Sequence, residues 1–144
     1  QYLFALVVFF PMAFFFLDVA PALSWLNFLP ILVLQVLFTL GFCFLVSAAT
    51  VFYRDIRHFT EILLMLLFWL TPIIYDINAV PDSLRTAISL NPLSYFILSY
   101  QDALYRNVFP ASDRLLAVIS LTFLFIALGY RLFINLKSRF PEEV

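Results

Sequence analysis

Long apolar runs alternate with short polar clusters along this chain, and the runs approach the length that crosses a lipid bilayer. About 20 helical residues are needed to span the hydrocarbon core. Four apolar runs come near to that length or exceed it, at residues 2–17, 28–52, 60–76 and 115–134. We therefore predict four membrane-crossing helices.

The segment between the third and fourth runs is too broken to cross the bilayer. Pro81 and Asn91-Pro92 each open a short helical pattern, because proline suits a first turn and asparagine is a good N-cap. Ten helical residues rise only about 15 Å, half of a hydrocarbon core of about 30 Å. We predict two short helices, at about 81–90 and 92–106. They would re-enter the membrane or lie along its outer face.

The second of these short helices carries an apolar stripe, which is typical of a helix that lies at an interface. Polar residues, including Ser94 and Asp102, lie off this stripe. The stripe consists of Leu93, Phe96, Ile97, Tyr100 and Leu104.

Composition supports a membrane protein. Hydrophobic residues make up 65% of the chain and charged residues 12%, whereas soluble domains contain about half and about a quarter. The expected fold class is an all-α integral membrane fold, with residues 1–144 forming one transmembrane domain. A net charge of −1 without a basic patch excludes a nucleic-acid partner. The chain enters an apolar run at once without a basic leader, so we expect the C-terminal part of a longer protein.

The distribution of Lys and Arg predicts the orientation. Residues 53–58 and the C-terminal tail fall on one side of the predicted crossings and hold most of these cations. By the positive-inside rule this side is cytoplasmic, and residues 77–111 face outward. The cytoplasmic set is Arg54, Arg57, Arg131, Lys137 and Arg139, and the outer set is Arg85, Arg106 and Arg114.

None of the predicted crossings has a charged residue in its central turns. Ion-driven carriers retain such residues despite the cost of burying them, so this pattern argues against secondary transport. The chain also lacks a glycine-rich phosphate loop, with two Gly in all. His58 has no second His or Cys nearby at metal-ligand spacing. We therefore expect no catalytic residue, no metal site and no bound cofactor in this chain.

The second run has a patterned face. At 100° per residue, its Gln35, Thr39, Phe42, Thr50 and the following Tyr53 fall within a sector of about 80°. This face is a candidate channel lining, with aromatic rings beside the polar groups. Alternatively, the polar members hydrogen-bond to a neighbouring helix or to their own backbone.

A different flank of the same run carries small residues, Gly41 and Ala48. Small residues let two helix backbones approach closely in membranes. We expect a helix–helix contact along this flank.

The polar cluster after the second run contains Arg54, Asp55, Arg57 and His58. It can be a docking surface for a soluble partner or a contact for lipid phosphate. A positive-inside anchor would explain the arginines equally well. A membrane enzyme would need Asp55 and His58 as a base pair, but no supporting nucleophile accompanies them.

In the third run, Thr71-Pro72 breaks the helix in its outer half, close to Tyr75. The break is either an ordinary proline kink, whose freed groups are satisfied by neighbours, or a hinge that leads to the outer helices. The residues that we assign to an outer gate beyond this hinge are Pro81, Asn91, Pro92, Tyr95 and Tyr100.

An ordered set of motifs resembles a transporter family. The set comprises Phe-Tyr-Arg-Asp-Ile-Arg-His at 52–58, Thr-Pro-Ile-Ile-Tyr at 71–75, Val80-Pro81, and Leu-Asn-Pro-Leu at 90–93. It is similar to the ABC-2 type permeases that export lipid-linked polysaccharide, O-antigen or teichoic acid in bacteria. The resemblance covers essentially the whole chain, but only the later four of that family's six crossings.

The resemblance implies a homodimeric permease of the bacterial inner membrane, working with two copies of a cytoplasmic ATPase that holds ATP and Mg. The substrate would be a glycan or polyol-phosphate polymer on undecaprenyl diphosphate. Residues 54–58 would lie near the ATPase, and the two short helices would form the outer gate. The family's N-terminal cytoplasmic helix and first two crossings would precede this chain.

Two other functions remain open on the sequence. One is export of a drug or small lipid by a permease of the same superfamily. The other is a membrane enzyme acting on lipid-linked sugars, which would turn over substrate without nucleotide.

Overall fold

The computed structural model describes residues 8, 11–12 and 23–137 of the 144-residue chain. All regular structure in this part is helical, which confirms the all-α class. The predicted crossing at 2–17 lies almost entirely outside the described residues. The elements in chain order are η1 (Leu23–Asn27), α2 (Phe28–Phe52), α3 (Ile56–Leu70), η2 (Ile77–Ala79), α4 (Asp82–Leu90), α5 (Pro92–Tyr100), η3 (Gln101–Tyr105) and α6 (Ser112–Lys137).

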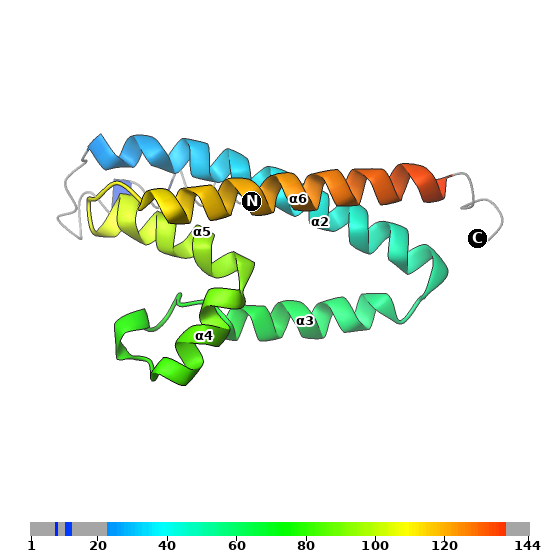
Figure 1. Cartoon of the computed structure of the whole chain (residues 1–144), viewed down its shortest axis with the longest axis horizontal. Helices are drawn as coiled ribbons and strands as arrows, with labels where there is room; N and C mark the ends of the chain where they lie inside the picture. Colours follow the sequence, from blue (N-terminus) through cyan, green and yellow to red (C-terminus); the bar gives the residue numbers. More distant parts are fainter. Residues whose placement is uncertain (1–7, 9–10, 13–22, 138–144) are drawn as a thin grey trace.

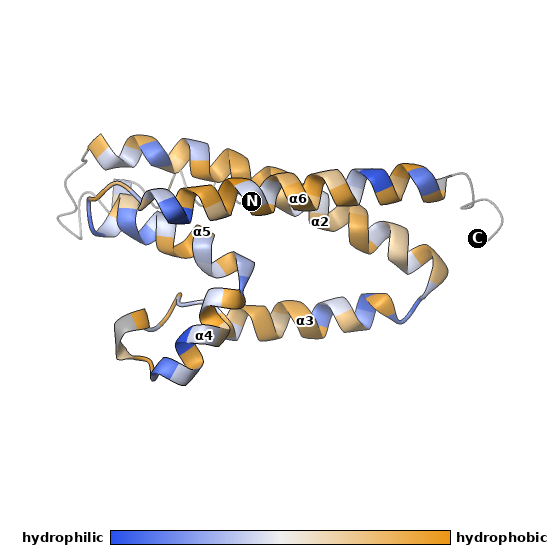
Figure 2. Ribbon diagram, in the orientation of Figure 1, coloured by the Kyte–Doolittle hydropathy of each residue, from blue (hydrophilic) through white to orange (hydrophobic). Residues whose placement is uncertain are grey.

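The helices α2 and α6 run side by side in the same direction along the long axis of the molecule (Figure 1). α2 has the predicted bounds, and α6 extends slightly beyond its predicted ones. In the described part of the chain, Leu23–Phe52 and Ser112–Leu136 are long and apolar enough to cross a membrane. Apolar residues cover most of both helices, and polar residues gather toward the ends (Figure 2). Much of this apolar surface is exposed in the single chain.

The two long helices touch through their backbones where Gly41 meets Gly129. A Cβ added at Gly41 would lie 2.5 Å from the backbone nitrogen of Ile126, and one added at Gly129 would collide with the carbonyl oxygen of Gly41. These are the only two glycines of the chain. The predicted close approach at Gly41 is therefore confirmed, and Ala48 is buried as well.

α3 differs from the predicted third crossing. It begins before residue 60 and ends at Leu70, because Thr71 has an extended ψ of 130°, as expected for a residue that precedes proline. The residues that we expected to extend the helix to 76 form a turn instead. The 15 residues of α3 rise about 22 Å, less than the roughly 30 Å of a hydrocarbon core. The four-crossing arrangement thus stays a prediction.

Both predicted short helices are present. Asn91 caps α5 as expected, since its Oδ1 accepts a hydrogen bond from the Leu93 backbone N–H at 3.0 Å, and Pro92 follows at the first position. Pro81 occupies the N-cap of α4 rather than its first turn, with extended backbone, so this detail of the prediction is wrong. α5 continues into η3, a turn of π-helix.

α5 packs against both long helices of the bundle. Phe96 of α5 is buried in a core with Phe38 of α2 and Val118 of α6. The Phe38 ring centroid lies 5.3 Å from that of Phe96. Ser94 and Asp102, which lie off the apolar stripe, are buried too. Protein therefore covers the polar side of this helix as well as its apolar stripe, and its position at the outer face of the membrane stays a prediction.

We predict that Gly129→Ala destabilises the fold. The new methyl group would meet backbone atoms of α2, which cannot rotate away, so we expect a loss at or above the top of the usual range of about 1–3 kcal/mol for overpacking. The change opposes helix propensity, which favours Ala by about 1 kcal/mol. Thermal melting of the purified protein measures the effect. Ser47→Ala, at an exposed position of α2, is the control, and equal melting temperatures for the two variants would contradict the backbone contact.

Candidate functional site

Polar side chains join the end of α3 to the start of α5. The Asn91 amide Nδ2 donates to the Leu67 carbonyl at 2.9 Å and to Thr71 Oγ1 at 2.8 Å. Thr71 Oγ1 in turn donates to the same Leu67 carbonyl at 2.6 Å. Carbonyls in the last turn of a helix lack intrahelical partners, and here side chains supply them. We call this set of Leu67, Thr71 and Asn91 the α3–α5 junction.

A second set of hydrogen bonds fixes the break that follows α3. Gln101 Nε2, at the far end of α5, donates to the Pro72 carbonyl at 2.7 Å. The Tyr75 hydroxyl donates back to the Leu70 carbonyl at 3.0 Å. Thr71 and Pro72 are both buried. The break is therefore held from both ends of α5, so movement at Thr71-Pro72 would be coupled to α5; a hinge there stays a prediction.

An ion cluster joins η3 to the first turn of α6. The Asp102 carboxylate is buried and lies 3.0 Å from Arg106 Nη1. Its other oxygen forms an ion pair with Arg114, whose guanidinium also donates to the Leu98 carbonyl. This cluster was not predicted from the sequence. The spacing of Asp102 and Arg106 signals an i,i+4 pair, but Arg114 belongs to another helix and gives no local signal.

The same end of the molecule is tied to η1, which directly precedes α2. The Ser24 hydroxyl donates to the Ala103 carbonyl at 2.8 Å, and the Trp25 indole N–H donates to Asn107 Oδ1 at 3.2 Å. Asn107 has a positive φ of 53°, a conformation that asparagine tolerates better than most residues. α5 and η3 are thus fastened to α2, α3 and α6.

The structure distributes the predicted channel-face residues among different contacts. Gln35 Oε1 accepts a hydrogen bond of 2.7 Å from the Tyr100 hydroxyl of α5. The hydroxyls of Thr39 and Thr50 donate to carbonyls of their own helix, at 2.8 and 2.7 Å. These are the bonds that the alternative interpretation expects. A role in lining a passage stays a prediction.

The aromatic members of that face also differ in their surroundings. Phe42 lines an apolar cavity of about 210 Å³ enclosed by α2, α3, α5 and α6. Its ring centroid lies 6.3 Å from that of Phe125. Tyr53 follows the last residue of α2 and is largely exposed.

The predicted gate residues separate into three places. Asn91 belongs to the α3–α5 junction and Pro92 follows it as the first residue of α5, while Tyr95 and Tyr100 pack against the core between α2 and α6. Pro81 is exposed at the start of α4, away from the other members.

The cluster at 54–58 is open to solvent. Arg54, Asp55, Arg57 and His58 are all exposed. Arg57 Nε lies 3.5 Å from Glu61 Oε1, and His58 Nδ1 lies 3.7 Å from the other oxygen of the same carboxylate.

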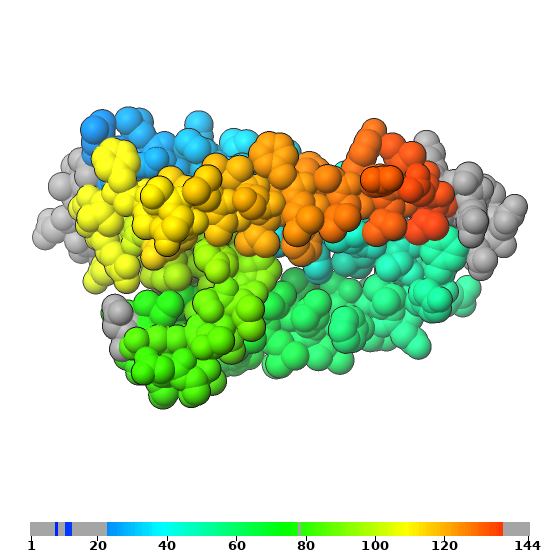
Figure 3. All heavy atoms as spheres, in the orientation of Figure 1, coloured from blue at the N-terminus to red at the C-terminus, as the bar shows by residue number. Residues whose placement is uncertain are grey.

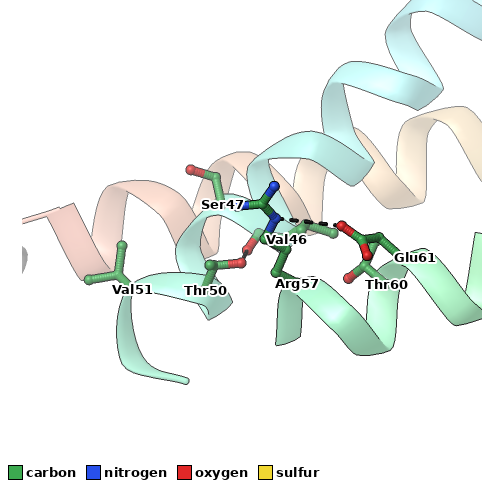
Figure 4. Close-up of a pocket in the computed structure, with 7 residues that line it drawn as sticks. All are labelled: Val46, Ser47, Thr50, Val51, Arg57, Thr60 and Glu61. Atoms are coloured by element: carbon green, nitrogen blue, oxygen red, sulfur yellow. Dashed lines mark hydrogen bonds and ion pairs between the residues drawn. The ribbon is translucent and has the colours of Figure 1, made fainter. Parts of the chain in front are cut away.

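Arg57 and Glu61 line a pocket of about 510 Å³ between the end of α2 and the start of α3. Figure 4 shows the Arg57 side chain extending toward Thr50 of α2. The wall contains short aliphatic side chains and the hydroxyls of Ser47, Thr50 and Thr60. This end of the molecule therefore offers exposed charge, in contrast to the paired charges around Asp102.

We predict that Asp102→Asn loosens η3 from α6. The substitution leaves two arginines without their carboxylate, and breaking a buried pair costs about 3–5 kcal/mol. Because both arginines keep partial solvent exposure, we expect the lower end of that range. Thermal melting measures the loss, with Asp82→Asn, which removes a solvent-exposed ion pair, as the matched control. If Asp102→Asn and Asp82→Asn had the same melting temperature, the ion cluster around Asp102 would not contribute to stability.

We predict that Asn91→Ser weakens the α3–α5 junction although it keeps a capping oxygen. A single hydroxyl cannot cap α5 and also donate to both acceptors on α3. Loss of the cap alone costs about 1 kcal/mol, and a buried group left unpaired costs about 1–3 kcal/mol. Asn91→Ser should therefore melt clearly below the wild type, and Asn91→Ala, which also loses the cap, should melt lower still. A serine variant as stable as the wild type would assign Asn91 to capping only.

Comparison with known proteins places the chain in a family. Residues 1–105 match the family described as ABC-2 type transporter. An O-antigen export system permease protein RfbA from Klebsiella pneumoniae is 34% identical over 124 residues, which is 85% of this chain and 47% of that protein. A second RfbA from Klebsiella pneumoniae is 32% identical, covering 89% of this chain and 49% of its own length.

A more distant relative, an O-antigen export system permease protein RfbA from Myxococcus xanthus, is 28% identical over 80% of this chain and 45% of its own length. The chain thus spans about half the length of the curated relatives that it matches. The family match covers well over half of the chain, and the two long apolar helices fit an integral membrane protein. We conclude that the chain belongs to the ABC-2 type transporter family of membrane permeases.

Proposed function

We propose that this chain is part of the permease of an ATP-driven exporter that moves a lipid-linked polysaccharide across the bacterial inner membrane. The observation that carries the proposal is the 34% identity, over 85% of the chain, to a permease named for O-antigen export. The relatives' similarity extends through the α3–α5 region and is not confined to one apolar run, since it covers 80% or more of the chain.

The two ends of the molecule differ in charge and packing, which supports a different function for each end. One end carries the exposed cluster Arg54, Asp55, Arg57 and His58, together with the C-terminal end of α6 (Figure 1). Exposed charges keep their hydration until a partner arrives, so they suit recognition of a soluble protein better than tight internal packing. This end is the docking surface for the cytoplasmic ATPase, of which two copies serve a permease dimer and bind ATP and Mg.

The opposite end holds α4 and α5, which act as the outer gate. α5 fills the space between α2 and α6 through the Gln35–Tyr100 hydrogen bond, the Phe96 core and the Asp102–Arg114 ion pair. A polymer can pass only when α5 breaks these contacts with α2 and α6 and forms others. The α3–α5 junction links that movement to α3, whose first turn carries Arg57 and His58.

The undecaprenyl-diphosphate anchor of the substrate would move along the apolar surface that α2, α3 and α6 leave uncovered, while the glycan passes between protomers. α3 has no fully buried residue, so the single chain leaves most of its surface available to lipid, to a second copy of the permease or to the substrate. Long apolar exposed faces of this kind mark membrane and protein contacts.

We predict that Arg54→Ala combined with Arg57→Ala in the full-length permease, expressed with its ATPase, abolishes or strongly lowers surface polysaccharide. The two substitutions remove both arginine charges from the docking surface, and neither arginine makes a buried contact. Surface polymer is measured by immunoblotting of whole cells, and retained lipid-linked polymer by extraction of the inner membrane.

The matched control replaces the same two residues by lysine (Arg54→Lys with Arg57→Lys), which keeps both positive charges at the exposed end. Its export should match that of the wild type. Unchanged export in the double alanine variant, with equal amounts of permease in the membrane, would show that the two arginines do not couple the permease to the ATPase. Normal surface polymer in cells that lack the permease would refute the substrate class itself.

A further inference from the structure

A cavity of about 390 Å³ lies where α4, α5 and the start of α6 meet. Figure 3 shows these three elements adjoining at the end of the molecule that carries the proposed gate. The volume falls within the range of about 300–1,000 Å³ that is usual for small-molecule sites. Part of the wall is aliphatic, and its polar members are Ser89, Ser94, Asp113 and Arg114. Tyr95 supplies an aromatic ring.

The charges at this cavity favour a ligand that donates hydrogen bonds. Arg114 is already paired with Asp102 and donates to the Leu98 carbonyl, so its positive charge is compensated within the protein. Asp113, by contrast, has no hydrogen bond or ion pair with any residue that the structure describes. The accessible charge is therefore a carboxylate, which repels phosphate and accepts hydrogen bonds from hydroxyl groups.

The wall contains two serine residues, one with an accessible hydroxyl and one whose hydroxyl is buried. Ser89 donates to the Thr86 carbonyl at 2.8 Å, which leaves its oxygen able to accept. Ser94 Oγ is buried and has no hydrogen-bond partner among the described residues. A buried polar atom without a partner is uncommon in a folded protein and calls for an explanation. A polar ligand in the cavity would lie against the residue that carries this unpaired hydroxyl.

We propose that this cavity binds a neutral sugar residue. A carboxylate, hydroxyl groups and an aromatic ring match the two chemical faces of a pyranose, whose hydroxyls donate and accept while its C–H face packs on a ring. A metal cation is disfavoured, because one carboxylate beside an arginine makes a poor set of ligands. The biological meaning rests on the proposed function: the site would hold a sugar unit of the exported polymer against α5 and α6.

The position of the cavity gives binding a consequence for the gate. Its wall combines residues of α4 and α5 with Asp113, Arg114 and Ala117 of α6. A sugar bound there would contact both sides of the boundary that the Asp102–Arg114 ion pair now holds closed. The bound sugar would favour the arrangement of α5 and α6 to which it binds more tightly. The size of this shift equals the difference between its binding free energies for the two arrangements.

We predict that the full-length permease in lipid nanodiscs, without ATPase, binds neutral sugars. The probes are galactose, mannose and N-acetylglucosamine, with glucose 1-phosphate as the anionic comparison, and the measurement is saturation-transfer-difference NMR titration. At least one neutral sugar should bind, more tightly than the phosphate ester. Asp113→Asn should weaken this binding about tenfold or more, since a hydrogen bond to a charged group is lost.

Asp82→Asn is the matched control, an acidic residue in the first turn of α4 that lies outside the cavity wall. It should bind as the wild type does. If Asp113→Asn does not fold, Ala117→Leu tests the same site by filling the cavity, and it too should abolish binding. Absence of binding by all three neutral sugars would overturn the proposal, as would unchanged binding in both cavity variants or preference for the phosphate ester.

This measurement separates the cavity from the exporter proposal, because it requires neither nucleotide nor transport. Sugar binding in a permease that proves to export another substrate would support the site and reject the proposed function. Confirmed polysaccharide export without sugar binding would reject the site alone.

Discussion

The backbone contact between Gly41 and Gly129 is the constraint on which the rest of the structure depends. It is a backbone-to-backbone approach of α2 and α6, and a Cβ on either residue would collide with the facing backbone. Association of helices in a membrane depends on such close van der Waals packing, because lipid is as apolar as the side chains. From that crossing the two helices frame the site into which α5 inserts, with Phe38, Phe96 and Val118 filling the space between them.

Inserting a short helix between two long ones creates a demand for polar partners. Backbone and side-chain groups removed from water must be satisfied by protein. The structure meets this demand at each end of α5: Asn91 and Thr71 serve the α3 carbonyls, and Arg106 and Arg114 surround Asp102. Because these contacts join α5 to α3 and to α6, the helix cannot move without changing both. That property suits the proposed gate.

The two ends of the molecule differ in how far their charged clusters are buried. Around Asp102, carboxylate and guanidinium groups neutralise one another inside the protein, whereas Arg54, Asp55, Arg57 and His58 remain exposed. Paired charges stabilise one arrangement until another group competes for them, while exposed charges keep their hydration. The shortness of α3, which ends at the proline break, places the junction between these two ends.

The sequence by itself determined the features with local causes. Apolar run length predicted α2, the Asn91-Pro92 pair predicted the start of α5, and Thr71-Pro72 predicted where α3 breaks. Contacts between residues that are distant in the chain could not be predicted from the sequence. The burial of α5, the Gln101–Pro72 bond and the Asp102–Arg114 pair join elements that local patterns describe separately. Only tertiary structure decides which of many chemically suitable partners meet, because helix periodicity orients a side chain but does not select its neighbour.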